Sequence, residues 1–225
     1  MSLRGSITQA IRKEYGRRAA YSQRIDRYNR LPLLKAFVSE NAHVPSFPTR
    51  EQMWTYLSQQ VPHPKDYLEF GVHTGHSILY WAELDNDSSS RFFGFDSFRG
   101  LPEEWNKAYP KGHFDTNGLS PETTDHRVEF ISGLFQDCLP QFLRDYMRQP
   151  QLIVNLDCDL YTSSLFCLTQ LNDFITPGTV LIFDEFGDVL HEFRAFHDYI
   201  SAYRRRFQVI SSHDNFFTVA LEILQ

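Results

Sequence analysis

Asp66-Tyr-Leu-Glu-Phe-Gly-Val-His-Thr-Gly-His-Ser77 is the stretch of sequence that decides the fold. Its first half is largely apolar and predicts a buried strand, and Gly71 and Gly75 predict a tight turn after it. About twenty residues further on, Arg91-Phe-Phe-Gly-Phe-Asp-Ser97 predicts a second buried strand that ends in a carboxylate. A glycine turn lets a ligand approach the backbone, and the acid can bind both hydroxyls of a ribose. Together the two segments indicate a nucleoside-containing cofactor.

The rest of the sequence extends this pattern into an α/β fold. Continuous apolar runs alternate with helical patterns, which predicts a doubly wound, mostly parallel sheet. Near the C-terminus, two apolar runs flank His213-Asp-Asn215, which predicts an antiparallel hairpin. We therefore expect a Rossmann-like sheet of seven strands that ends in this hairpin. The strand-like runs cover 66–72, 91–96, 128–132, 152–157, 178–184, 207–212 and 216–223, and the helical patterns lie near 76–84, 137–147, 162–175 and 189–206.

The N-terminal part of the sequence has a different character. Residues 6–40 show helical spacing, a proline-rich joint follows at 44–48, and Thr49-Arg-Glu-Gln52 resembles a capping box that opens a short helix. We expect a helical extension over 1–64 and a catalytic domain over 65–225. Residues 1–40 hold nine Lys/Arg and three Asp/Glu. This basic arm could be a solvated helix face, contact an anion or RNA, or dock on an acidic surface, which would let the chain form homo-oligomers through its N-terminal helices.

Composition excludes several classes of function. The formal net charge is −6, and outside the basic arm the chain holds 13 basic and 25 acidic residues, which argues against nucleic acid as the main partner. We find no signal peptide and no apolar run of about 18 residues, so no membrane association is expected. The three cysteines have no paired CxxC spacing, which disfavours a disulfide framework or a zinc site. These features together predict a cytoplasmic protein.

The interval 98–127 is too long for an ordinary connection between a strand and a helix. Its several glycines and prolines make one continuous helix unlikely to form, and it carries Trp105, Tyr109, His113 and Phe114. Two interpretations have equal weight: a lid that clamps a substrate, or a surface insertion whose aromatic residues pack downward.

Acidic residues follow the later predicted strands. One strand ends at Asp157 and the next at Asp184, which Glu185 follows directly. Asp159 has period-two spacing from Asp157 and would point to the same side if the strand persists. The carboxyl ends of adjacent parallel strands lie about 4.8 Å apart, so these groups would meet at one sheet edge. Carboxylates at such a short separation repel one another unless a cation neutralises them. Mg²⁺ is a suitable cation because it prefers oxygen ligands. The alternative is structural, with the acids capping a helix or holding a turn.

The glycine turn alone is less specific. Gly71 and Gly75 lack the G-x-G-x-x-G spacing of a nicotinamide site, and no Gly-Lys-Ser/Thr follows as in a P-loop. Five motifs in order give a narrower indication: LEFGVHTG, GFDSFRGLPEEW, GLFQDCLP, NLDCDLY and FDEF. They resemble class I S-adenosylmethionine-dependent methyltransferases over roughly 66–200, and within these the macrocin O-methyltransferase type, which methylates hydroxyls of sugars and related natural products with Mg²⁺. The terminal hairpin is the sheet ending of that fold.

The resemblance implies roles for individual residues. Glu69, Gly71 and Gly75 would surround the methionine part of S-adenosylmethionine, Asp96 would bind the ribose, and 132–135 would lie by the adenine. The complete set of implied cofactor-binding residues is Glu69, Gly71, Val72, His73, Thr74, Gly75, Ser77, Asp96, Ser97, Phe98, Gly133, Leu134, Phe135 and Asp157.

The same resemblance assigns the chemistry. Asp157, Asp184 and Glu185 would bind Mg²⁺, and Asp159 would be the catalytic base. Where this chain has Asp184-Glu185, the family more usually has two aspartates. His113 is a second candidate for the base because it lies in the predicted lid.

The sequence therefore predicts a Mg²⁺-assisted O-methyltransferase that acts on a hydroxylated small molecule such as a sugar or natural product. One alternative is a cofactor-binding or scaffolding protein that keeps the fold without turnover. A weaker alternative is an oxidoreductase that uses a nicotinamide dinucleotide, against which the glycine spacing and the terminal hairpin both argue.

Overall fold

The computed structural model describes residues 3–225, which form two compact units that divide between Ala42 and His43. The first unit contains α1 (Leu3–Glu40), a helix that continues through Pro32. The second unit, His43–Gln225, is an α/β domain and holds the candidate site. Among residues 3–225, no helix combines the length and the apolar character needed to cross a membrane.

The α/β unit begins earlier than residue 65. It includes β1 (Ser46–Phe47) and α2 (Arg50–Gln60), both of which lie in the segment expected to belong to the N-terminal extension. The physical reason is burial, because α2 places Met53, Trp54 and Leu57 in the core of the domain. The Thr49 hydroxyl starts this helix by accepting the Gln52 backbone N–H at 3.2 Å.

The sheet has eight strands in the order β1-β7-β8-β6-β5-β2-β3-β4. The predicted doubly wound sheet with an antiparallel hairpin is confirmed, since β7 and β8 pair antiparallel and β8 also pairs antiparallel with β6. The predicted count of seven strands is one too low. The extra strand is β1, whose two residues pair parallel with β7 and are too few to leave a pattern in the sequence. The other strands are β2 (Lys65–Phe70), β3 (Arg91–Asp96), β4 (Val128–Ser132), β5 (Gln151–Leu156), β6 (Val180–Phe183), β7 (Phe207–His213) and β8 (Thr218–Ile223).

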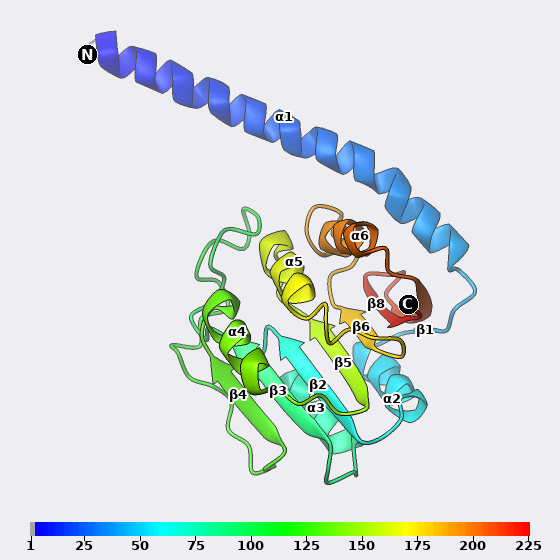
Figure 1. Ribbon diagram of the computed structural model, residues 1–225. Coiled ribbons are helices and arrows are strands. Elements are labelled where there is room, and N and C mark those ends of the chain that lie inside the picture. Colours follow the sequence, from blue (N-terminus) through cyan, green and yellow to red (C-terminus); the bar gives the residue numbers. More distant parts are fainter. Residues whose placement is uncertain (1–2) are drawn as a thin grey trace. The chain divides into compact units, whose positions relative to one another are not determined.

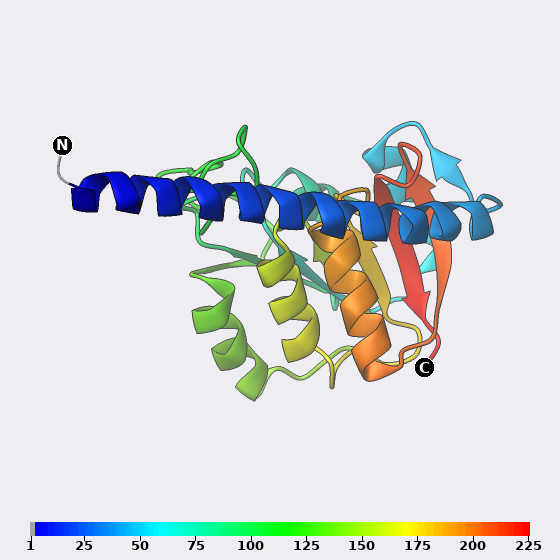
Figure 2. The same ribbon diagram turned by 90° about the horizontal axis from the view of Figure 1, so that it is seen from above.

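Helices cover both faces of the sheet (Figure 1). On one face lie α2 and α3 (His76–Leu84). On the other lie α4 (Phe135–Asp145), α5 (Tyr161–Gln170) and α6 (Glu192–Tyr203), which run side by side in Figure 2. The central strands are buried along their length because both of their faces are covered.

Alternating side chains of the strands supply a core on each face. Tyr67 points toward α3, where its ring lies 5.2 Å from that of Trp81. Phe70 stacks on Phe95 at 4.9 Å and meets Phe135 of α4 edge-on at 5.4 Å. The odd-numbered and even-numbered positions of β2 therefore anchor opposite helix layers.

The topology places a crevice beside β2. The chain runs outward from β2 to β3 and β4 and then returns to β5 on the other side of β2. Such a reversal is a topological switch point, where the connections leave in opposite directions and open a binding crevice at the carboxyl ends of the strands.

Candidate active site

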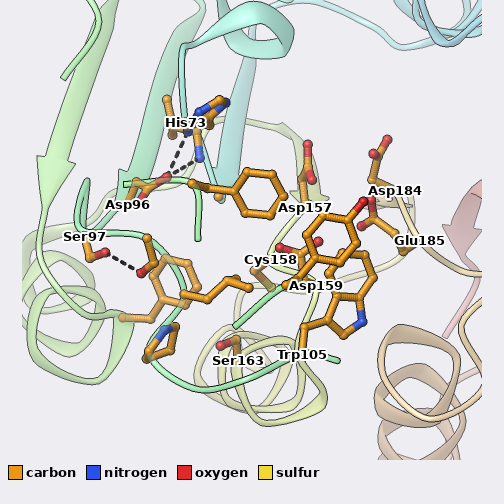
Figure 3. Close-up of a pocket in the computed structure, with 18 of the residues that line it drawn as sticks. His73, Asp96, Ser97, Trp105, Asp157, Cys158, Asp159, Ser163, Asp184 and Glu185 are labelled. Carbon is orange, nitrogen blue, oxygen red and sulfur yellow. Dashed lines mark hydrogen bonds between the residues drawn. The ribbon is translucent and has the colours of Figure 1, made fainter. Parts of the chain in front are cut away.

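A cavity of about 460 Å³ lies at the carboxyl edge of the sheet. The ends of β2, β3, β5 and β6 border it, together with the loop after β3 and the turn after β4. Figure 3 shows His73, Asp96 and Ser97 on one side of this cavity and Asp157, Asp184 and Glu185 on the opposite side. The glycine turn and the acidic strand ends therefore border the same cavity at the carboxyl edge of the sheet.

Asp96 organises the turn after β2. One of its carboxylate oxygens accepts the backbone N–H groups of Val72 and His73, each at 2.9 Å. The other accepts the Phe98 backbone N–H at 2.8 Å. These three bonds fix the carboxylate at the cavity wall, and the second oxygen keeps acceptor capacity for a ligand hydroxyl.

Gly71 lets the backbones of β2 and β5 approach at this edge. Its φ of 94° lies in the left-handed region that favours glycine, and its N–H donates to the Phe95 carbonyl at 2.9 Å. On the other side, the Asp157 N–H donates to the Phe70 carbonyl at 2.9 Å. The backbone hydrogen bonds between neighbouring strands thus continue one residue past the end of β2 and of β5, which places Asp157 directly beside the turn.

Three carboxylates form a cluster on the far side of the cavity. One ligand oxygen each from Asp157, Asp184 and Glu185 lies within 4.8 Å of the others. Burial raises the pKa of the Asp157 carboxyl well above its ordinary value, and the nearby Asp184 and Glu69 add to this effect. Among the described residues, Glu185 Oε2 is buried and has no hydrogen-bond partner.

Arg50, at the start of α2, reaches into this cluster. Its guanidinium Nη1 forms an ion pair with Asp184 Oδ2. Burial disfavours the charged guanidinium, but attraction to Asp184, Asp157 and Glu185 leaves the pKa of Arg50 raised. Arg50 was not predicted as a site residue, because its only signal in the sequence was its position next to the helix-capping Thr49.

Glu192, the first residue of α6, binds the backbone of one member of the cluster. It is fully buried, and its Oε2 accepts the backbone N–H of Glu185 at 2.9 Å. Burial raises the pKa of Glu192 well above its ordinary value, and Asp184 contributes to this effect. This bond holds the backbone of Glu185 in place at the end of β6. Glu192 was not predicted as a site residue either.

Asp159 lines the same cavity but lies outside the three-carboxylate cluster. Its φ of 61° and the end of β5 at Leu156 show that the strand does not persist to Asp159, so the condition for Asp157 and Asp159 to point to the same side is not met. Burial raises the pKa of the Asp159 carboxyl to about 7, with smaller contributions from Asp184, Asp96 and Asp188. An acid with this pKa can exchange a proton near neutral pH.

The structure brings most of the predicted site residues to the cavity. Asp159 lines it together with eleven others: Gly71, Val72, His73, Asp96, Ser97, Gly133, Leu134, Phe135, Asp157, Asp184 and Glu185. The remaining predicted residues do not line it. They are Glu69, Thr74, Gly75, Ser77, Phe98 and His113.

Local packing accounts for two of these differences. Glu69 is fully enclosed beneath the turn, where its Oε2 accepts bonds from the Tyr67 hydroxyl at 2.7 Å and the Asn155 amide at 3.1 Å. His113 is half-buried and packs against two aromatic residues of the loop, with its ring centroid 4.9 Å from that of Tyr109 and 4.4 Å from that of Phe114.

The long loop supplies an aromatic wall, which we define as Trp105, Tyr109 and Phe114. All three line the cavity, with Trp105 stacked on Tyr109 at 4.8 Å and Tyr109 on Phe114 at 5.7 Å. The Trp105 indole N–H donates to Asp188 at 3.2 Å, which ties the loop to the segment after β6. The sequence had left two interpretations open for these aromatic residues, a lid that clamps a substrate or a surface insertion packed downward. Leu101 and Phe217, which also line the cavity, were not predicted.

Comparison with known proteins agrees with this architecture. A curated protein of Streptomyces olivaceus, 8-demethyl-8-(2,3-dimethoxy-alpha-L-rhamnosyl)-tetracenomycin-C 4'-O-methyltransferase, is 28% identical over 160 residues. The match spans 58% of this chain and 58% of that relative.

Solved structures share the fold. The calicheamicin methyltransferase CalS11 superposes with a TM-score of 0.60 at 20% identity, covering 76% of this chain and 77% of that one. The O-methyltransferase NovP gives a TM-score of 0.57 at 18% identity, covering 78% and 80%.

Residues 68–186, just over half of the chain, match the family described as a methyltransferase domain. This range runs from the strand before the glycine turn to the acidic pair after β6. The resemblance to class I methyltransferases predicted from the sequence is confirmed, and the chain belongs to the methyltransferase-domain family.

Proposed function

We propose that this protein is an S-adenosylmethionine-dependent O-methyltransferase that acts on a hydroxyl of a sugar or related natural product with the assistance of Mg²⁺. Membership of the methyltransferase-domain family supports the reaction class. The name of the Streptomyces olivaceus relative, a 4'-O-methyltransferase of a rhamnosyl-tetracenomycin, supports the acceptor class.

One observation carries the proposal: a single cavity joins the turn organised by Asp96 to the cluster of Asp157, Asp184 and Glu185. The first side suits a nucleoside, because Asp96 is fixed by backbone N–H groups and the adjacent turn is open to a ligand. The second side suits an oxygen-rich acceptor and a cation. The cavity therefore has room to position a donor and an acceptor against each other, which is a major source of rate in a displacement.

The cluster fits Mg²⁺ by its chemistry. It offers only carboxylate oxygens, and the buried Glu185 Oε2 lacks a hydrogen-bond partner among the described residues. When bound, Mg²⁺ would supply electrostatic stabilisation of negative charge on an acceptor oxygen. Asp157, Asp184 and Glu185 are the residues that would hold it. S-adenosylmethionine would supply the methyl group as a sulfonium.

Asp159 is the side chain best placed to receive the proton of the acceptor hydroxyl. It faces the same cavity as the cluster, and its pKa of about 7 allows it to be ionised at neutral pH. His113 is less well placed, because it does not line the cavity, whereas the neighbouring Tyr109 and Phe114 do. The aromatic wall would pack against an apolar face of the acceptor and exclude water from it.

Calorimetric titration with S-adenosylhomocysteine tests the cofactor, in parallel with a nicotinamide dinucleotide. We expect binding of the first alone, and the opposite result would reject the proposal. Incubation with S-adenosylmethionine, Mg²⁺ and a panel of sugars and glycosides, followed by mass spectrometry, tests the reaction. Cofactor binding without a mass increase of one methylene in any acceptor would favour a cofactor-binding protein without turnover.

A further inference from the structure

We infer that Arg50 is an internal counterion of the acidic cluster and competes with the divalent cation for it. The inference rests on the proposed function, because it concerns the same three carboxylates. It assigns to the start of α2 a role in setting the affinity of the cation site.

The contacts of Arg50 identify the charge that balances the cluster in the protein without a cation. Its guanidinium pairs with Asp184 Oδ2, and Asp184 is one of the three carboxylates of the cluster. Within the part of the chain that the structure describes, Arg50 is the only Lys or Arg among the residues that line the cavity. Asp184 is buried and the other two carboxylates are half-buried, and three such acids together are costly without a positive partner.

The Arg50 side chain contacts the cluster and can also move away from it. Its Cζ lies 5.6 Å from the centre of the Trp54 ring, so the residue one turn along α2 supports the guanidinium. The side chain is 38% exposed, whereas that of Asp184 is 6% exposed. The arginine can therefore swing toward solvent while the carboxylate cannot, which is the asymmetry that a displaceable counterion needs.

A divalent cation held by the three carboxylates would share Asp184 with this guanidinium. Two positive charges at one carboxylate repel in a poorly solvated site, so each weakens the binding of the other. A coupling of this kind commonly changes affinity about 5- to 150-fold. The cation site of the wild-type protein is thus weaker than its three acids alone would make it.

Titration with Mn²⁺, followed by electron paramagnetic resonance at one fixed pH near 8, measures this coupling without any turnover. We expect Arg50→Gln to bind Mn²⁺ about tenfold more tightly than wild type. Arg50→Lys, which keeps the charge, should bind as wild type does. Asp157→Asn should lose the binding, which locates the ion at the cluster.

Arg194→Gln is a matched control. Arg194 also pairs with an aspartate, Asp198 at 3.7 Å, also lies over an aromatic ring, Tyr161 at 4.0 Å, and is 34% exposed, but it does not line the cavity. Its substitution should leave the Mn²⁺ affinity unchanged. A tighter site in this variant as well would show a general effect of net charge and would overturn the inference.

Thermal unfolding gives an independent readout. Without divalent cations, Arg50→Gln should melt at a lower temperature than wild type because the cluster has lost its counterion. Saturating Mg²⁺ should raise the melting temperature more in the variant than in wild type, because the variant binds the ion more tightly.

The outcomes separate the two proposals. Equal or weaker Mn²⁺ binding by Arg50→Gln, with normal binding by wild type, overturns the counterion role and leaves the magnesium proposal intact. No binding by either protein overturns both, while the titration with S-adenosylhomocysteine still reports separately on the cofactor.

Discussion

Gly71 and Asp157 come so close that a Cβ atom added to Gly71 would lie 1.7 Å from the carbonyl oxygen of Asp157. This contact joins the turn after β2 to the acidic end of β5. The two strands are neighbours because the chain reverses its direction of sheet growth between them. The side of the site proposed for the cofactor and the side proposed for the cation therefore share one piece of backbone.

We expect Gly71→Ala to lower the free energy of unfolding by at least about 2 kcal/mol, because the new methyl group meets main-chain atoms at a left-handed φ. Gly112→Ala is the control. Gly112 also has a positive φ, 82°, but nothing lies within 4 Å of its added Cβ, so only the backbone cost of about 1 kcal/mol applies. Urea unfolding measures both variants, and equal losses would show that the close approach contributes nothing.

We expect Glu69→Gln to stabilise the protein at neutral and alkaline pH. Burial raises the pKa of Glu69 from its ordinary value of 4.5 to about 7. Glu69 therefore ionises more easily in the unfolded chain than in the folded protein. As the pH rises from 4.5 to about 7, this difference lowers the free energy of unfolding of the wild type, and at higher pH the free energy stays at the lowered value. The advantage of glutamine should be absent near pH 4 and reach on the order of 3 kcal/mol at pH 8.

Asp66→Asn provides the contrast for Glu69→Gln. Asp66 is equally buried, but it accepts two bonds from Arg91, both at 2.8 Å. Its substitution leaves Arg91 without its partner and should destabilise the protein at pH 8. Denaturant unfolding at pH 4, 6 and 8 tests both variants. A Glu69→Gln advantage that does not grow with pH would contradict the role of burial.

We expect Asp159→Asn to lower kcat about 10²- to 10⁴-fold, because the amide cannot accept the hydroxyl proton. The affinity for S-adenosylhomocysteine should not change. In the wild type, kcat should rise with pH and level off at or below about pH 7, since the base acts when ionised and a bound cation favours its ionised form. Asp173→Asn, at an exposed position that does not line the cavity, is the control and should retain full activity. An Asp159→Asn enzyme with the wild-type pH profile would exclude this base.

We expect Trp105→Ala to raise the KM for the acceptor about tenfold while the affinity for S-adenosylhomocysteine stays the same, because the stacked ring belongs to the aromatic wall. Trp105→Phe keeps a ring but loses the bond to Asp188, so it separates stacking from loop attachment. Steady-state kinetics with varied acceptor measures both. An equal KM in all three proteins would exclude contact between this residue and the acceptor.

Much of the fold follows from local patterns. The alternation of apolar runs and helical spacing predicted the doubly wound sheet, because strands that are buried on both faces need continuous apolar sequence. The strand β1 escaped detection because its pairing partner, β7, is more than 150 residues away and two residues carry no period.

The candidate site likewise contains residues that the sequence predicted and residues that only tertiary packing placed. The sequence alone placed Asp96, Asp157 and Asp184 at one edge, because each follows a strand and the carboxyl ends of parallel strands meet there. Tertiary packing decided that Glu69 lies beneath the turn, that Trp105 faces the cavity, and that Arg50 pairs with Asp184. Those positions depend on how separate elements dock, and no local period encodes the distance between residues 50 and 184.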